Sequence, residues 1–173
     1  MRLTLLAILV VLAADVLAGL QPALDGKLQS QLMQLFPQAT SFTPKSGDPP
    51  HYKAYVGGNG PAGTLAGFAF WTTELEPLER GYDGPIKMLV GMDLKGILTG
   101  VVVVEHHEPY GSFSVEPPRF AAQFRGKNIR DPFKVGDDVY AVSRASITIT
   151  SATRAVKNSA RRVARQLLPP PAF

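Results

Sequence analysis

Hydroxyl side chains are concentrated between Ser143 and Ser151, directly before an apolar pattern that predicts a C-terminal helix over 152–168. A helix N-terminus offers unpaired backbone N–H groups and the positive end of the helix dipole, and both favour a phosphate. Arg144 would add a cation beside that site. The alternative is structural, because Ser and Thr commonly cap helices and alternating isoleucines and threonines are also typical of a strand.

A second group of potential ligands is Glu105, His106, His107 and Glu108. Histidine and carboxylate groups bind metal ions when they converge on one point. Adjacent residues at a strand end point to opposite faces, so at most alternate members could act together. We therefore expect no metal site, and we expect one of these side chains to line a pocket while the others remain in solvent.

Basic side chains recur along the predicted C-terminal helix, namely Arg154, Lys157, Arg161, Arg162 and Arg165. Cations suit the negative end of the helix dipole, so a solvated basic face is the simplest interpretation. Contact with an acidic partner or with anionic lipid headgroups is the alternative. We expect no nucleic-acid partner, because the chain offers no platform of interleaved aromatic and basic residues.

The composition limits the available chemistry. The chain has 173 residues and a formal charge of +4, with 16 Gly, 15 Pro and no Cys. The absence of cysteine excludes disulfides, thiolate metal sites, iron–sulfur clusters and a cysteine nucleophile, so redox chemistry would need a cofactor held by other groups. The length suits one domain with a hydrophobic core, and the many Gly and Pro residues predict short elements joined by turns.

The N-terminus is typical of an export signal. Arg2 precedes an apolar run over 3–14, and small or β-branched residues lie at the −3 and −1 positions of a possible cut after Ala18. The alternatives are an uncleaved membrane anchor and a buried helix. We therefore predict a signal peptide or anchor over 1–18, a single domain over 19–173, and a periplasmic or other extracytoplasmic location.

Hydrophobic periodicity predicts helices at the two ends and strands between them. A first amphipathic helix is expected over 20–36, where leucines recur every three or four residues. The strands are expected to form two hairpins, and a short helix and a short strand should follow them. The expected ranges are 51–56 with 64–73, 86–93 with 97–105, then 119–124 and 139–142. The predicted class is α+β, with a central, mainly antiparallel sheet built from hairpins and flanked by an N-terminal and a C-terminal helix.

The order of these features resembles the extracytoplasmic FMN-binding domain family over about 52–167. Residues 81–86 (GYDGPI) with 89–91 (LVG) look like the family's G-Y-x-G-P-I-x-x-L-V-G signature, and 105–109 (EHHEP) looks like the H-x-E-P variant of NosR-type members. The family also includes flavin-carrying subunits of the Rnf and sodium-pumping NADH:quinone oxidoreductase complexes.

The resemblance implies a site for FMN. In the family, a flavin transferase of the ApbE type links the flavin phosphate to the last Thr of an S-G-A-T-x-T motif. That motif falls on residues 143–148, which makes Thr148 the expected acceptor. This chain departs from the motif: Arg144 replaces Gly, Ser146 replaces the first Thr, and Tyr140 occupies a position that is often acidic. Arginine would remove access to positive φ and could close the loop to a transferase, yet it would also bring a cation to the phosphate. Covalent and dissociable FMN both remain open.

The resemblance also implies which residues surround the cofactor. An isoalloxazine ring needs an apolar or aromatic slot with a few polar groups. We expect Tyr82, Leu89 and Pro109 in that slot and His107 and Glu108 at its rim, whereas Phe120 and Phe124 should belong to the core. The candidate cofactor-binding residues are Ser143, Arg144, Ala145, Ser146, Thr148, Tyr82, Leu89, His107, Glu108 and Pro109.

The expected function is electron relay between membrane or periplasmic redox partners, rather than conversion of a substrate. Two alternatives remain. The chain could be a binding or maturation module that keeps the fold without FMN, or an enzyme that reduces a small molecule at a flavin.

Overall fold

Five strands pair antiparallel in the order in which they occur along the chain, β1-β2-β3-β4-β5. The computed structural model describes residues 24–170, so the predicted signal or anchor over 1–18 lies outside the described residues. The α+β class and the antiparallel sheet predicted from the sequence are confirmed. The strands are β1 (Ser41–Phe42), β2 (Tyr52–Val56), β3 (Thr64–Trp71), β4 (Lys87–Asp93) and β5 (Leu98–Glu105).

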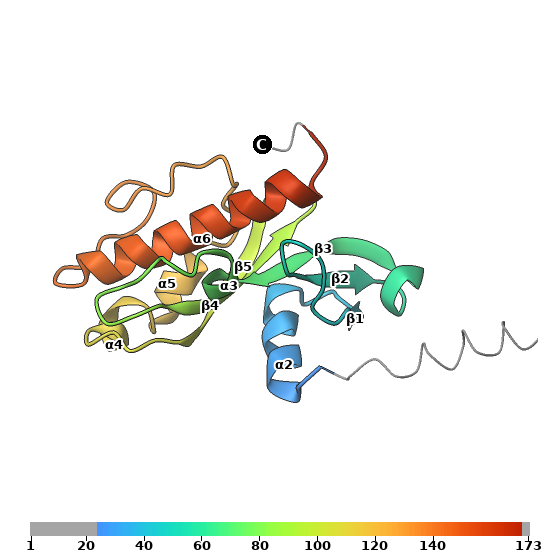
Figure 1. Ribbon diagram of the computed structural model, residues 1–173, viewed down its shortest axis with the longest axis horizontal. Helices are drawn as coiled ribbons and strands as arrows, with labels where there is room; N and C mark the ends of the chain where they lie inside the picture. The colour runs from blue at the N-terminus through green and yellow to red at the C-terminus, as the bar shows by residue number, and fades with distance from the viewer. Residues whose placement is uncertain (1–23, 171–173) are drawn as a thin grey trace, which may run out of the picture.

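Helices flank this sheet near both ends of the described chain (Figure 1). Asp25 caps the first of them, because its carboxylate accepts a hydrogen bond from the N–H of Leu28 at 3.4 Å. Among the described residues, no helix is both long and apolar enough to cross a membrane. The helices are α2 (Gly26–Leu35), η1 (Gly60–Ala62), α3 (Thr72–Leu75), α4 (Gly111–Ser114), α5 (Pro118–Ala122) and α6 (Ser146–Leu167).

Both predicted hairpins are present, β2 with β3 and β4 with β5. The β4–β5 turn is fixed by Asp93, whose Oδ1 accepts hydrogen bonds from the N–H groups of Lys95 and Ile97, each at 2.8 Å. Gly96 adopts φ +77° in this turn, a conformation that costs glycine little. The local turn chemistry therefore sets the register of the two strands.

Alternating residues of β4 separate two hydrophobic clusters, one on each face of the sheet. Met88, Val90 and Met92 pack in the cluster that includes the buried side of α6. Leu89 packs in the other cluster, with residues of α2. Figure 1 shows α6 along one side of the sheet and α2 on the other. The period of two along a strand thus decides which side chains can approach α6.

The start of the C-terminal helix differs from the prediction. We expected a strand over 139–142 and a helix from Ala152, whereas α6 begins at Ser146 and residues 140–142 lie in no strand. The buried residues Ile149, Ala152 and Val156 recur at spacings of three and four. Burial of this stripe against the sheet outweighs the strand-like alternation of Ile and Thr.

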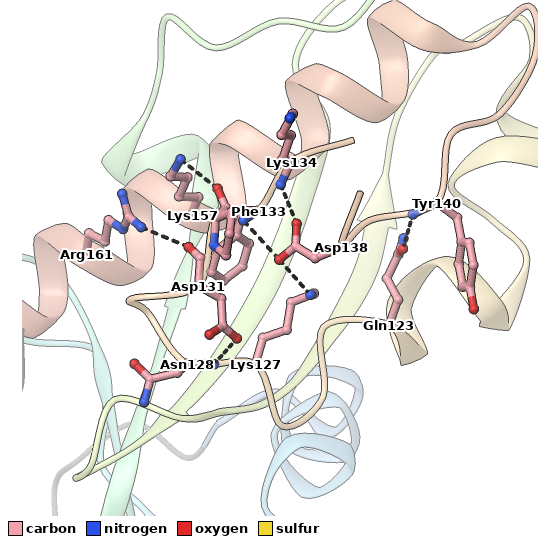
Figure 2. Close-up of polar contacts among 11 residues, drawn as sticks. Gln123, Lys127, Asn128, Asp131, Phe133, Lys134, Asp138, Tyr140, Lys157 and Arg161 are labelled. Carbon is pink, nitrogen blue, oxygen red and sulfur yellow. Dashed lines mark hydrogen bonds and ion pairs between the residues drawn. The ribbon is translucent and has the colours of Figure 1, made fainter. Parts of the chain in front are cut away.

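The loop over 123–142 is held by polar contacts before it reaches α6 (Figure 2). Asp138 makes three of these contacts. Its carboxylate accepts hydrogen bonds from the N–H groups of Phe133 and Lys134 and from Nζ of Lys127. Further along, Oε1 of Gln123 accepts a hydrogen bond from the N–H of Tyr140 at 2.9 Å. These contacts fix the segment that leads into the hydroxyl-rich start of α6.

The basic side chains of α6 also bind other parts of the domain. Arg161 donates to the carbonyls of Ile129 and Asp131 at 2.7 and 3.0 Å, and Lys157 donates to that of Pro132 at 2.9 Å. On the α3 side, Arg162 donates to the carbonyl of Leu75 and Arg154 pairs with Glu79. These four cations therefore hold loops against the helix.

Asp138 should make the fold sensitive to acid. Burial raises the pKa of Asp138, but the hydrogen bonds that its carboxylate accepts outweigh burial and hold the pKa below its ordinary value. A lowered folded-state pKa stabilises the fold at pH values above about 4, and this stabilisation is lost as the pH falls through the folded-state pKa. The acid limb is the fall in unfolding free energy as the pH is lowered from 7 to 3. Asp138→Asn should therefore make this fall smaller, as measured by urea titration at each pH.

Asp137→Asn is the matched control, because the Asp137 carboxylate is exposed and should leave the acid limb unchanged. An acid limb in Asp138→Asn as steep as in the wild type would contradict the assignment.

Candidate functional site

Thr148 meets a buried carboxylate at the start of α6. Its hydroxyl donates a hydrogen bond to Oε2 of Glu108, a residue 40 positions earlier in the chain. Both side chains are buried, with 2% of Thr148 and 6% of Glu108 exposed. This hydrogen bond therefore connects Thr148, the expected flavin acceptor, with the segment 105–109 (EHHEP).

Glu108 is fixed from its other side by the glycine-rich segment before β4. Its Oε2 accepts a hydrogen bond from the N–H of Tyr82 at 3.0 Å, and its Oε1 accepts one from the N–H of Asp83 at 3.1 Å. A Cβ built on Gly81 would collide with Oε1 of Glu108. Glycine at this position leaves room for the carboxylate, and the two N–H groups orient it.

A cavity of about 430 Å³ opens beside the Ser143 end of the motif. This volume lies within the range of small-ligand pockets. Phe120, Tyr140 and Ile149 supply aromatic and apolar walls, and Arg119 and Gln123 supply polar groups. The remaining lining residues are Ser114, Ala141, Val142 and Ser143. An aromatic slot with few polar groups fits an isoalloxazine ring.

The loop before α6 keeps a left-handed residue where the family motif has glycine. Arg144 adopts φ +67°, so the expectation that arginine removes positive φ is wrong for this chain. For an L-residue other than Gly or Asn, this conformation costs about 1 kcal/mol. The structure tolerates that cost and presents an exposed arginine beside the start of α6.

The start of α6 has no side-chain cap. Ala145 occupies the N-cap position and has no side-chain oxygen, and the structure shows no capping hydrogen bond there. The backbone N–H groups of the first turn can therefore act as donors to an anion. Together with the exposed cation of Arg144, they make a donor set suited to a phosphate group.

His106 and His107 have different surroundings. Within residues 24–170, no group of three or more His, Cys, Asp or Glu side chains could hold a metal ion. His106 accepts the N–H of Glu108 at Nδ1 over 3.2 Å, and its Nε2 lies 3.3 Å from Oε1 of Glu116. His107 is exposed, so His106 supports the loop while His107 faces solvent.

The structure brings some of the expected site residues together and separates others. Ser143 lines the cavity, and Thr148, Glu108 and the backbone of Tyr82 are in direct contact. The Tyr82 side chain is 70% exposed, and Pro109 is exposed as well. Ala145 is buried and Ser146 is exposed at the first position of α6.

Leu89 does not line this cavity. It lies on the opposite face of the sheet, in the cluster that contains Leu32 and Trp71. Its neighbours in β4, Met88 and Val90, face α6 instead. A motif match places a residue in the sequence, but strand alternation decides on which face it lies.

Sequence reasoning missed several residues of the site. Asp83 and Gly81 orient Glu108, and Arg119, Gln123 and Tyr140 line the cavity. Gly81 and Asp83 belong to the GYDG run of the family signature, which could have pointed to both. Phe120 and Phe124 are buried in the core as predicted, although Phe120 also reaches the cavity.

Residues 81–161 match the family model of the FMN-binding domain. The resemblance to the FMN-binding domain family, whose cofactor is FMN, is therefore confirmed over these residues, as the sequence motifs predicted. The described site fits this cofactor, because it combines a phosphate-type donor set with an adjoining aromatic cavity.

Several curated relatives are named as a subunit of an ion-translocating oxidoreductase complex. The protein from Yersinia pestis is 34% identical over 105 residues, which cover 52% of this chain and 47% of that protein. The one from Erwinia tasmaniensis is 34% identical over 89 residues, covering 46% and 42%. The one from Haemophilus influenzae (strain PittEE) is 45% identical over 49 residues, covering 28% and 22%. The chain thus spans less than half the length of these relatives.

Gly81→Ala should displace the Glu108 carboxylate, because the added Cβ would overlap Oε1. Overpacking of this kind costs about 1–3 kcal/mol of unfolding free energy. Urea unfolding monitored by circular dichroism measures the loss. Gly26→Ala is the control, since a Cβ there meets nothing within 4 Å and alanine favours helices. Equal stability of Gly81→Ala and the wild type would contradict this role of Gly81.

Proposed function

We propose that this chain is an exported FMN-carrying domain that relays electrons between membrane or periplasmic redox partners, with FMN attached by a phosphoester to Thr148. The observation that carries the proposal is the contact between the Thr148 hydroxyl and the buried Glu108 carboxylate. A cavity of about 430 Å³ lies beside Ser143, at the start of the same motif. FMN supplies one-electron and two-electron chemistry when it is bound. The domain would span 19–173, with 1–18 as a signal or anchor.

Each part of the site would have a defined task in holding the cofactor. The first turn of α6 and Arg144 would bind the phosphate, through backbone N–H groups and a guanidinium. Phe120 and Tyr140 would contact the ring, and Gln123 would keep Tyr140 in place through the backbone hydrogen bond. The hydroxyl of Thr148 is almost fully buried, so attachment would require local opening of the segment before α6.

The names of the relatives support the electron-relay part of the proposal. Each is called a subunit of an ion-translocating oxidoreductase complex. A domain without cysteine would need a bound cofactor such as flavin for a redox role, and attachment through a hydroxyl would prevent loss of the cofactor outside the cell. A flavin transferase of the ApbE type and membrane-bound redox proteins are the proposed partners. The location would be periplasmic or otherwise extracytoplasmic.

The departures from the family motif favour a second candidate, a module that keeps the fold without covalent FMN. Arg144 and Ser146 occupy positions where the motif has Gly and Thr. Under this alternative, the cavity beside Ser143 would bind another partner or a dissociable flavin.

Thr148→Val decides between these candidates. Wild-type protein co-expressed and exported with a flavin transferase should gain the mass and the visible absorbance of an FMN phosphoester. Thr148→Val should gain neither, because valine has no oxygen to esterify. Thr150→Val is the matched control two residues further along α6, and it should load normally.

Three outcomes would count against this attachment. Unmodified, colourless wild-type protein, under conditions that load a related protein with an intact S-G-A-T-x-T motif, would contradict covalent FMN. Loss of loading in Thr150→Val alone would shift the attachment to Thr150. Yellow colour retained by both variants without added mass would indicate dissociable FMN.

Tyr140→Ala tests the assignment of the ring to the cavity. Removing one aromatic wall should weaken the binding of free FMN by about fivefold, since an aromatic contact contributes about 1 kcal/mol. Quenching of flavin fluorescence on titration with the protein measures the dissociation constant. Tyr110→Ala is the control, because Tyr110 is exposed and does not line this cavity. Equal affinities of the two variants would place the ring elsewhere.

A further inference from the structure

We propose that Glu108 is the group that accepts the proton of Thr148 when the phosphoester forms. This inference rests on the proposed function, and it assigns part of the attachment chemistry to the domain that receives the flavin. It is carried by the hydrogen bond from the Thr148 hydroxyl to Oε2 of Glu108. Among the residues that the structure describes, Glu108 has the only titratable side chain hydrogen-bonded to Thr148.

The geometry is that of an activated nucleophile. A threonine hydroxyl is a weak nucleophile, and proteins activate such groups with a base in hydrogen-bond contact that is itself oriented by a third group. Here Thr148 is the nucleophile and Glu108 is the base. The N–H groups of Tyr82 and Asp83 are the orienting groups, at 3.0 and 3.1 Å from the two carboxylate oxygens.

The surroundings make the carboxylate specific for this task. Each of its oxygens accepts one backbone N–H group, so the side chain cannot rotate without losing a buried hydrogen bond. Gly81 lets the chain pass close to Oε1, where any larger residue would collide. The remaining acceptor position on Oε2 is the one that faces Thr148. The two backbone donors therefore orient a lone pair of Oε2 toward the Thr148 hydroxyl.

The step balances with a flavin dinucleotide, FAD, as the donor. Oγ1 of Thr148 forms a bond to the phosphorus on the riboflavin side, the pyrophosphate P–O bond breaks, and AMP leaves with the bridging oxygen and its electron pair. The hydroxyl proton passes to Glu108. No group is oxidised or reduced. The neutral carboxyl then lies beside the new phosphodiester anion without like-charge repulsion and can donate a hydrogen bond to it.

Glu108→Gln tests this assignment, because the amide oxygen can still accept a backbone hydrogen bond while the group can no longer take a proton. Purified wild-type and variant proteins are mixed with FAD and a flavin transferase of the ApbE type, and loading is followed by mass. General-base catalysis contributes about 10²-fold or more, so the turnover rate for Glu108→Gln should fall about 100-fold with little change in KM for the acceptor protein. Glu105→Gln, an exposed carboxylate three residues earlier, should load as the wild type does.

Two further measurements separate proton transfer from a structural role. Glu108→Gln should lower the thermal midpoint, because its amide NH2 replaces one acceptor oxygen and faces a backbone N–H group. Glu108→Asp, which restores a carboxylate on a shorter side chain, should recover part of the rate. Gly81→Ala, which displaces the intact carboxylate, should also slow loading.

Loading of Glu108→Gln at the wild-type rate would overturn this inference and leave attachment at Thr148 standing. So would equally slow loading of Glu108→Gln and Glu108→Asp with matching losses of thermal stability, which indicates a structural role. Failure of the wild type to load at all would overturn the attachment proposal together with this inference.

Discussion

The contact between Glu108 and Thr148 ties together the parts of the structure on which the site depends. The carboxylate receives two backbone N–H groups from the segment before β4 and one hydroxyl from the first turn of α6. Burying a carboxylate costs free energy unless it is hydrogen-bonded, so the folded state needs all three donors in place. The contact thereby joins the sheet, the loop after β5 and the C-terminal helix at one point.

The elements that could be predicted from the sequence are those fixed by local chemistry. Both hairpins follow from alternating apolar residues and from turn residues such as Asp93 and Gly96. Thr148 became a candidate through a short motif that needs no knowledge of the fold. The start of α6 could not be predicted in the same way, because Ile and Thr alternate there and only burial of Ile149 against the sheet favours a helix.

The long-range contacts of the site lay beyond sequence reasoning. Glu108 and Thr148 are 40 residues apart, and no spacing rule pairs them. Leu89 belongs to a signature motif, yet the pleat of β4 turns it to the far face of the sheet. Arg144 keeps the left-handed conformation expected only of glycine, because the surrounding loop and α6 determine its backbone.

The uncapped start of α6 would link the proposed cofactor loading to the stability of the domain. A missing N-cap leaves about 1 kcal/mol of helix stability unrealised, and a phosphate at the same N–H groups would supply it. The flavin-loaded domain should then be the more stable form, with its gain concentrated in the helix that fills the core. After loading, the first turn of α6 would open less often. The folded domain would then protect the bound cofactor.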